Sequence, residues 1–313
     1  MSAITHHDLQ LEPTITPLDF FDPVIQEATD GTIIVGFLAH DDDCQNPLEN
    51  CDGMGSIHSF SRKHSNHKTP EEIQSGVADS VLRLTVLLSY FEHGQCRWGV
   101  AGTMSGMADF RWDGVGFAGM WVPDKSCLEH IHSTAIAAHL PPGVKVEYKS
   151  KRNPDGTCIT RPCKPGERSY FKNPDGTDQG TVPDERYTNV ITLTLPDGRE
   201  RGGYASFTSA YRAAARSLGI KLTAETRQSG ELAAARKAAQ EACDAYTSWC
   251  NGECYGWVVA KFDADGYELD WDSCWGYVGD TKYLKEELAG NVTHELARCN
   301  ALADATTIAA TIP

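Results

Sequence analysis

The chain has 313 residues, of which 41% are hydrophobic, so it is long enough to bury one large core or two ordinary ones. No apolar run approaches the roughly 18 residues that a membrane-spanning helix needs. The first residues also lack the basic and apolar regions of a signal peptide. These features argue against a membrane protein and predict a cytoplasmic one.

Charge is unevenly distributed along the chain, whose formal net charge is −15. Residues 1–61 contain eleven Asp or Glu and no Lys or Arg, whereas residues 145–172 contain eight Lys or Arg and three acids. This pattern disfavours nucleic-acid binding over the whole surface and leaves only 145–172 for a local contact. The eleven cysteines lack regular spacing, which predicts mostly reduced thiols.

The first hundred residues predict two strands followed by a long helix. The apolar run 31–40 is rich in β-branched residues and predicts a buried strand, and 56–61 predicts a shorter one. Thr69 and Pro70 are typical of a helix start, and Gly94 would end this helix. Its hydrophobic residues recur at helical spacing: Ile73, Val77, Val81, Leu84 and Leu88.

The composition changes at residue 151. Four elements are predicted before it: strands over 96–102 and 110–123, a helix over 124–139 and a strand over 144–150. Residues 151–186 contain Asn-Pro-Asp-Gly-Thr twice, at 153–157 and at 173–177, together with further prolines. These turn signals predict a basic, loop-rich insertion.

The last part of the chain predicts two hairpins, each followed by helix. The first hairpin, 187–207, turns at 196–198, and the second, 254–280, turns at Asp265-Gly266. Three helices are predicted: 208–218, 231–249 and 282–303. The order of elements favours the α+β class, with a mixed or antiparallel sheet and packed helices.

The sequence therefore divides into three consecutive parts. Residues 1–150 form an N-terminal α+β part that carries an acidic loop, and 151–186 form the basic insertion. Residues 187–313 form a C-terminal α+β part that we expect to pack with the first as one domain.

The acidic loop after the first predicted strand is the strongest candidate site. Five oxygen donors could gather around Ca²⁺ or Mg²⁺: Asp41, Asp43, Asn46, Glu49 and Asp52. The ligand order of an EF-hand is missing, and an exposed turn with solvated acids is the favoured alternative. A second acidic run, 263–272, is better explained as the turn of the second hairpin.

Histidines follow the acidic loop and suggest catalysis. His58 and His64 lie beside Arg62 and Lys63, so a divalent-metal hydrolase or nuclease centred on residues 41–67 is conceivable, with these histidines as the catalytic candidates. None of the metalloprotease, P-loop or serine-hydrolase motifs is present.

Cysteines and tryptophans offer weaker signals. A zinc clip could use four thiols: Cys158, Cys163, Cys250 and Cys254. Their spacing does not fit a zinc knuckle, and core packing is favoured for Cys243 and Cys250. Four tryptophans crowd the C-terminal region: Trp249, Trp257, Trp271 and Trp275. Most should be core, although an exposed pair would suit a partner contact.

Three segments carry a resemblance to other proteins: HDDDCQNPLENCDGMGSIHSFSRKH (40–64), NGECYGWVVAKFDADG (251–266) and WDSCWGYVGD (271–280). They resemble a group of uncharacterised accessory proteins carried by bacteriophages and other mobile elements. The group has no established activity, so the resemblance implies a context, the cytoplasm of the host cell. Proteins in that context often inhibit restriction, CRISPR and other defence systems.

Three classes of function remain open. The favoured one is a non-enzymatic acidic protein that engages and inhibits a host protein of the defence type. The residues of this chain that would bind the host protein are Asp41, Asp42, Asp43, Glu49 and Asp52. The metal-dependent hydrolase is the first alternative. The second is a structural or assembly module in which 151–186 joins protomers, and the opposite charges of 151–186 and 1–61 are compatible with a homo-oligomer.

Overall fold

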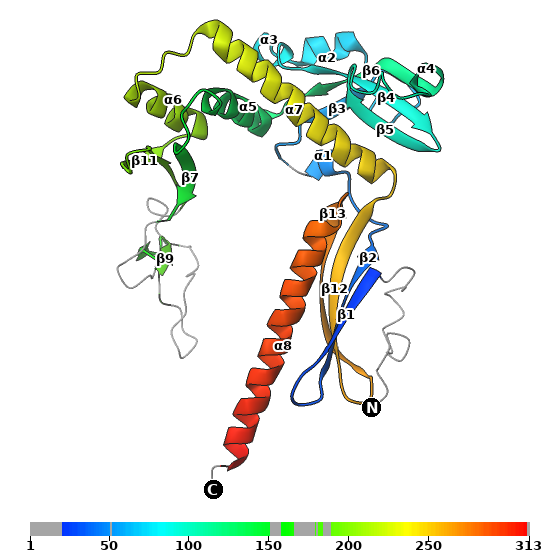
Figure 1. Cartoon of the computed structure of the whole chain (residues 1–313), viewed down its shortest axis with the longest axis vertical. Helices are drawn as coiled ribbons and strands as arrows, with labels where there is room; N and C mark the ends of the chain where they lie inside the picture. Colours follow the sequence, from blue (N-terminus) through cyan, green and yellow to red (C-terminus); the bar gives the residue numbers. More distant parts are fainter. Residues whose placement is uncertain are drawn as a thin grey trace. The chain divides into compact units, whose positions relative to one another are not determined.

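The computed structural model describes residues 21–50, 52–150, 158–165, 179, 181–183 and 189–311, without the side chains of 21, 22, 50 and 304–311. Most of the predicted insertion, including both Asn-Pro-Asp-Gly-Thr copies, lies outside these residues. Helices and antiparallel strands make up the chain (Figure 1), which confirms the α+β class.

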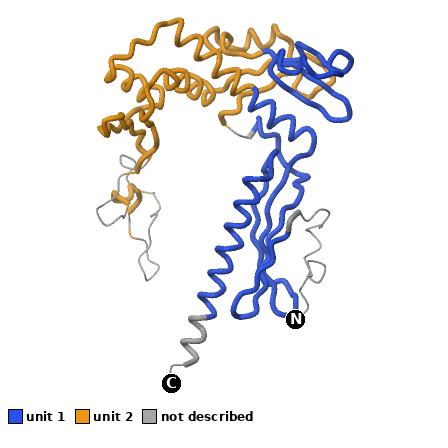
Figure 2. Tube along the Cα trace, in the orientation of Figure 1, with its two compact units in different colours: residues 1–51, 87–119, 240–313 blue, residues 52–86, 120–239 orange. Residues whose placement is uncertain are grey.

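Two compact units, interleaved in sequence, divide the chain (Figure 2). Unit 1 comprises residues 1–51, 87–119 and 240–313, and unit 2 comprises residues 52–86 and 120–239. Each unit therefore draws on both the N-terminal and the C-terminal part of the sequence.

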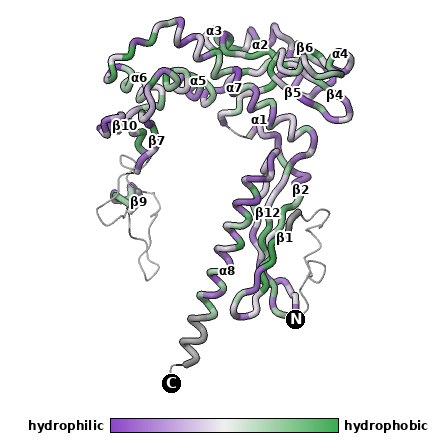
Figure 3. Tube along the Cα trace, in the orientation of Figure 1, coloured by the Kyte–Doolittle hydropathy of each residue, from purple (hydrophilic) through white to green (hydrophobic). Residues whose placement is uncertain are grey.

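A four-stranded antiparallel sheet and one long helix form the main layer pair of unit 1. The strand order is β1 (Phe21–Glu27), β2 (Ile33–His40), β12 (Cys254–Phe262) and β13 (Glu268–Val278). Helix α8 (Lys282–Thr311) packs along this sheet. Hydrophobic residues are concentrated in the strands and alternate with polar ones along α8 (Figure 3), so one face of α8 contributes to the core.

Gly36 in β2 allows α8 to approach the sheet closely. A Cβ atom at Gly36 would lie 2.4 Å from Val292 Cγ2 and 2.9 Å from Leu288 Cδ1. Both side chains are almost fully buried. The bare backbone of β2 is therefore the surface that receives these two side chains of α8.

Replacing Gly36 with Ala should destabilise the protein by about 1–3 kcal/mol, because the added methyl group overpacks this contact. Urea unfolding followed by circular dichroism measures the change. The double variant Gly36→Ala/Val292→Ala should lose less stability than the sum of the two single variants.

Gly116→Ala is the matched control for this experiment. Gly116 also lies in a strand of unit 1, but no heavy atom lies within 4 Å of a Cβ added there. Its stability should change by no more than about 0.5 kcal/mol. Equal unfolding curves for Gly36→Ala and the wild type would contradict the close packing of α8 on β2.

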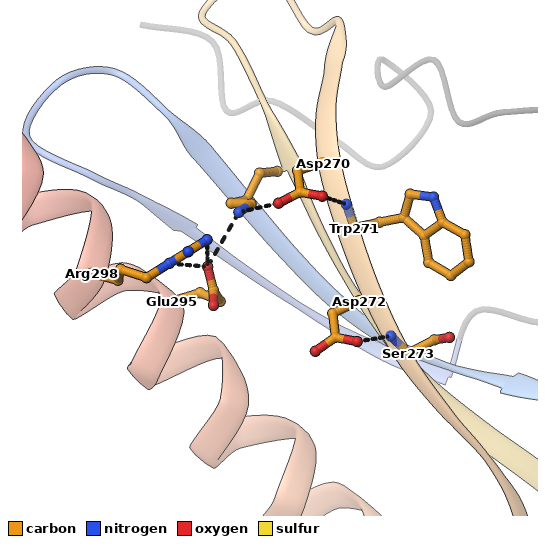
Figure 4. A network of polar contacts seen from close by, with 7 residues as sticks. Asp270, Trp271, Asp272, Ser273, Glu295 and Arg298 are labelled. Atoms are coloured by element: carbon orange, nitrogen blue, oxygen red, sulfur yellow. Dashed lines mark hydrogen bonds and ion pairs between the residues drawn. The ribbon is translucent and has the colours of Figure 1, made fainter. Parts of the chain in front are cut away.

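The outer edge of β13 is protected by its own aspartates. Asp270 accepts a hydrogen bond from the backbone N–H of Trp271 (3.0 Å), and Asp272 accepts one from Ser273 (2.8 Å), as Figure 4 shows. These carboxylates occupy donors that another strand would otherwise use. The turn before β13 is held by Asp263, which accepts from Asp265 and Tyr267, so the predicted hairpin is confirmed.

An ion-pair network ties β12 and β13 to α8 (Figure 4). Lys261 Nζ lies 2.7 Å from Asp270 Oδ2 and 3.4 Å from Glu295 Oε2. Arg298 also pairs with Glu295 at 2.8 Å. Burial disfavours the charged amine of Lys261, but the hydrogen bond to Asp270 and the charge of Glu295 outweigh it and raise its pKa.

A second part of unit 1 is the hairpin of β4 (Val86–His93) and β5 (Gln95–Val100). On the other side of β4 lies β6 (Gly114–Val122), preceded by the single-turn α4 (Phe110–Asp113). The Ser89 hydroxyl donates to the Gly116 carbonyl (3.0 Å) between these strands. The strands predicted over 96–102 and 110–123 correspond to β5 and β6, but the second one begins only at Gly114, because Phe110–Asp113 forms α4.

Helix α7 (Ala224–Cys250) supplies the hydrogen-bond acceptors for the free edge of β5. The backbone N–H of Val100 donates to Gln240 (3.0 Å), and that of Trp98 donates to Thr247 (2.9 Å). Asn251, just beyond the helix, accepts from the N–H of Cys96 and donates to its carbonyl, each at 3.0 Å. Gln240 and Thr247 are seven residues apart in α7, so both side chains lie on the helix face that runs along β5.

Thr247→Val should destabilise the protein by about 1–3 kcal/mol, because it leaves the buried N–H of Trp98 without an acceptor while keeping the side-chain shape. Equilibrium unfolding gives this value, and hydrogen exchange of the Trp98 amide should become faster.

Thr293→Val in α8 is the control. Its hydroxyl donates to the Ala289 carbonyl on an exposed helix face, so a change within about 0.5 kcal/mol is expected. Unchanged Trp98 exchange in Thr247→Val would contradict the role of α7 at this edge.

Unit 2 contains a three-stranded antiparallel sheet covered by a helix. The sheet order is β11 (Glu200–Tyr204), β10 (Val190–Thr194) and β7 (Lys145–Lys149). Ala210 and Ala214 of α6 (Phe207–Ser217) pack on Ile191 and Leu193 of β10. Helix α5 (Lys125–Ala137) packs beside α6, where Glu129 accepts from the N–H of Thr208 (2.7 Å).

Short elements complete both units. They are α1 (Pro47–Asn50) in unit 1 and, in unit 2, β3 (Ser56–Ser59), α2 (Pro70–Gly76), α3 (Asp79–Leu82), β8 (Thr160–Pro162) and β9 (Thr181–Pro183). The strands β8 and β9 pair antiparallel. The sequence predicts neither of them, and it also misses β1.

The predicted helix from Thr69 to Gly94 is wrong beyond its first turns. Thr69 does cap α2 in a capping box with Glu72, but Val77 has extended backbone (φ −125°, ψ 133°) and ends that helix. After the short α3 the chain enters β4, where Leu88 pairs with Val100. The stripe at helical spacing was misleading because Val86–His93 is also an apolar, strand-compatible run, and pairing with β5 decides its structure.

Candidate functional site

A pocket of about 630 Å³ lies in unit 1 at the acidic loop. The loop follows directly after β2, and the pocket's other wall comes from β13. Nine residues line it: His40, Asp41, Asp42, Asp43, Cys44, Gln45, Pro47, Trp275 and Gly276. The volume falls in the range of small-ligand sites.

Asp41 fixes the loop in place. Its Oδ2 accepts the backbone N–H of Gly276 (2.9 Å), its Oδ1 accepts that of Asp43 (3.2 Å), and its own N–H donates to the Cys254 carbonyl (2.9 Å). Trp249 Nε1 donates to the Cys44 carbonyl at 2.8 Å, which holds the next part of the loop. Asp41 is therefore a structural anchor.

Asp42 and Asp43 are both exposed at this pocket. Among the residues that the structure describes, none donates a hydrogen bond to the carboxylate of Asp42 or to that of Asp43. Hydrogen bonds of Asp41 and of the Cys44 carbonyl hold the backbone of this loop, and the carboxylates of Asp42 and Asp43 are accessible at the pocket. Among the predicted binding residues, these two are the ones best placed to contact a partner.

Trp275 forms the aromatic wall of the pocket. A Cβ atom at Gly256 would lie 2.3 Å from the Trp275 ring, so the ring rests against the bare backbone of β12. Trp275 Nε1 donates to Ser273 Oγ (2.9 Å), and the residue stays 41% exposed. Gly276 has φ +90°, which brings its N–H to Asp41. Trp257 is buried, whereas Trp271 is exposed like Trp275.

The other predicted metal ligands are used differently. Asn46 accepts from the N–H of Leu48 (3.0 Å) and donates to Glu49 Oε1 (3.1 Å), so these two side chains satisfy each other. Asp52 is exposed and belongs to unit 2. Within the described ranges, no group of three or more His, Cys, Asp or Glu is placed to hold a metal ion. A Ca²⁺ or Mg²⁺ site stays a prediction.

The catalytic candidates His58 and His64 lie in unit 2. His64 Nδ1 lies 2.8 Å from Ser59 Oγ, which also accepts the N–H of Ser61. Ser59 is fully buried, so this Ser–His contact lacks the access that a nucleophile requires. Burial, and then the charge of Lys68, lowers the pKa of His58, so its neutral form is favoured at pH 7.

Asp124 holds residues 53–55 in the second half of the acidic segment. From the sequence, Asp124 was predicted only as the start of a helix. Its carboxylate accepts from the N–H groups of Gly53 (2.9 Å), Gly55 (3.0 Å) and Cys127 (2.7 Å). Burial disfavours the ionised carboxylate, but these three donors outweigh it and keep the pKa of Asp124 low. Trp121 Nε1 adds a hydrogen bond to the Met54 carbonyl (2.8 Å).

Asp124→Ala should cost about 1–2 kcal/mol of stability at pH 7, because the cap of α5 and the anchor of residues 53–55 are lost together. The pKa of Asp124 is lower in the folded protein than in the unfolded chain, where it is about 3.9. The ionised carboxylate therefore stabilises the folded protein above that pH, and this contribution disappears as the pH falls through the folded-state pKa. The difference from the wild type should therefore shrink from pH 7 to pH 3 in urea unfolding.

The exposed Asp79→Asn variant of unit 2 serves as the control and should stay within about 0.5 kcal/mol of the wild type. A difference for Asp124→Ala that does not depend on pH would contradict a role of the ionised carboxylate.

The four cysteines of the predicted zinc clip belong to different elements: Cys158 and Cys163 flank β8 in unit 2, whereas Cys250 ends α7 and Cys254 begins β12 in unit 1. Cys243 is fully buried, as expected, but the prediction of a core position for Cys250 is wrong, because Cys250 ends α7 and is exposed.

The chain matches no protein-family model, no curated protein and no solved structure. Among the described residues, no helix is both long enough and apolar enough to cross a membrane. The case for a function therefore comes from the pocket itself and from the resemblance of the three sequence segments.

Proposed function

We propose that the chain is a phage or mobile-element accessory protein that acts in the host cytoplasm as a non-enzymatic acidic binding protein. Its pocket engages a basic side chain of a host protein, and the proposed outcome is inhibition of a defence-type partner. The single observation that carries the proposal is the pocket that Asp42, Asp43 and the exposed Trp275 line together.

A guanidinium or ammonium group matches the chemistry of this pocket. The carboxylates of Asp42 and Asp43 attract a cation, and the face of an indole ring stabilises it further when it is within about 6 Å. No Lys or Arg belongs to the nine residues that line the pocket. An arginine suits the site best, because its planar group can stack on Trp275 and also donate to a carboxylate.

The loop is preorganised, so it can bind a partner without a large rearrangement. Asp41, Cys44 and Gly276 are held by backbone hydrogen bonds in unit 1, so the negative charges need little ordering when a partner arrives. The net charge of −15 supports the same partner chemistry, because it attracts basic protein surfaces over the range that salt permits.

A fluorescein-labelled hexa-arginine peptide tests the proposal by fluorescence anisotropy. Binding should weaken by about 10-fold in Asp42→Asn/Asp43→Asn and in Trp275→Leu, because charge or the aromatic face is removed. It should also weaken between 50 and 300 mM NaCl. A hexa-citrulline peptide, which has the same shape without charge, should not bind.

Asp265→Asn/Glu286→Gln is the matched control, because it removes two exposed charges of unit 1 away from the pocket. It should bind the arginine peptide within about twofold of the wild type. An equal loss in both double variants would mean that the peptide responds only to net charge. Cleavage of labelled DNA or RNA with Mg²⁺, Mn²⁺ or Zn²⁺ that is lost in His64→Ala would instead support the hydrolase.

A further inference from the structure

Two tryptophans form an exposed row on the edge strand β13 of unit 1. Trp271 is 47% exposed and points away from α8 (Figure 4). It pairs with Ala260 of β12, which belongs to the sheet face opposite α8. Trp275 lies on that same face, because its ring rests on Gly256, and the neighbouring Trp257 packs against α8. Both rings are therefore presented on one face of one strand.

The row continues the aromatic wall of the pocket along β13. Trp275 lines the pocket, and Trp271 stands four residues before it, which corresponds to about 13 Å of strand. Between them on this face lies Ser273, whose hydroxyl accepts the Nε1–H of Trp275 (2.9 Å). That polar contact is satisfied within the chain, so the tryptophans offer apolar surface to a partner. Half-exposed tryptophans are frequent anchors of protein interfaces.

The backbone of β13 opposes the addition of a partner strand. The N–H groups of Trp271, Ser273 and Gly276 already donate to carboxylates of this chain. A strand that paired with this edge would have to displace these charge-assisted hydrogen bonds. An α-helix satisfies its own backbone and needs only side-chain contacts, so it is the element that suits this row.

The charge around the row determines the charge of the partner. Residues 262–281, which contain β13 and its turn, have six Asp or Glu and no Lys or Arg. Asp42 and Asp43 add two exposed carboxylates at the pocket end of the row. A helix that brings apolar residues to the two rings is therefore attracted if the flanks of its apolar face are basic.

We propose that Trp271 and Trp275 form a docking row for a basic amphipathic helix of the host protein. This inference rests on the proposed function and names the structural class of its partner. An arginine of the helix enters the pocket, and apolar residues on the same helix face cover Trp271. Because a helix rises 1.5 Å per residue, about 13 Å corresponds to about nine residues. The apolar face of the helix must therefore extend at least two turns beyond the arginine.

A fluorescein-labelled, alanine-rich helical peptide of about 18 residues tests the row by fluorescence anisotropy. It carries an arginine near its N-terminus, leucines four, seven and eleven residues after it, and lysines beside this face. Trp271→Ala should weaken its binding about 10-fold, because an apolar anchor is lost. The same variant should bind the hexa-arginine peptide within about twofold of the wild type, because the pocket is intact. A peptide of equal composition with its leucines spread around the helix should bind the wild type about 10-fold more weakly.

Trp112→Ala is the matched control, because Trp112 is an exposed tryptophan of unit 1 that lies in α4 and does not line the pocket. It should bind both peptides like the wild type, and circular dichroism checks that each variant is folded. Three results would overturn the proposal: equal binding of the two helical peptides, equal losses in Trp271→Ala and Trp112→Ala, or a wild-type dimer in sedimentation that Trp271→Ala dissociates, which would assign the row to a second copy of this chain. Hexa-arginine binding is read separately, so the row can fail while the pocket stands.

Discussion

The hydrogen bonding of the free edge of β5 to side chains near the end of α7 is the contact on which much of unit 1 depends. A strand edge exposes donors that must find acceptors, and here Gln240, Thr247 and Asn251 provide them. The same arrangement fixes the last turn of the helix. Trp249 from that turn donates a hydrogen bond to the Cys44 carbonyl of the acidic loop. The end of α7 therefore positions the edge of β5 and the loop that lines the pocket.

Two glycines on neighbouring strands determine what packs against the sheet of unit 1. Gly36 in β2 admits Val292 and Leu288 of α8, and Gly256 in β12 receives the ring of Trp275. Neither glycine is needed for a turn. Both are needed because a Cβ atom would occupy the volume of another side chain, so helix docking and pocket shape follow from the same absence of a side chain.

The sequence predicted those elements whose local pattern agrees with their tertiary surroundings. Hairpins with Asp-Gly turns, the buried run of β2 and the capped α5 were foreseen because turn chemistry and burial point to one structure. Val86–His93 was misassigned because its apolar residues satisfy both a helical and a strand pattern. The pairing of Leu88 with Val100 resolves this ambiguity, and such pairing is a tertiary property.

The candidate site was predictable from the sequence only in part. Asp41, Asp42 and Asp43 stand together in the sequence, so their grouping was visible, but the anchoring role of Asp41 depends on Gly276, which lies 235 residues away. The sequence does not distinguish Trp275 from the other tryptophans of the C-terminal region. The partners of Asp124, Cys96 and Asn251 could not be predicted, because each residue forms hydrogen bonds with a segment that is remote in sequence.

The two acidic runs of unit 1 show how the same side chain serves structure or binding. In 263–272, Asp263, Asp270 and Asp272 accept backbone N–H groups of the turn and of the strand edge, so their charge is used inside the fold. In the loop after β2, Asp41 is used in this way, while Asp42 and Asp43 face solvent beside an aromatic ring. What separates the two uses is whether a backbone donor lies within reach. A carboxylate that accepts no such donor keeps its full attraction for a cation from outside the chain, and this is the physical basis for assigning the binding role to Asp42 and Asp43.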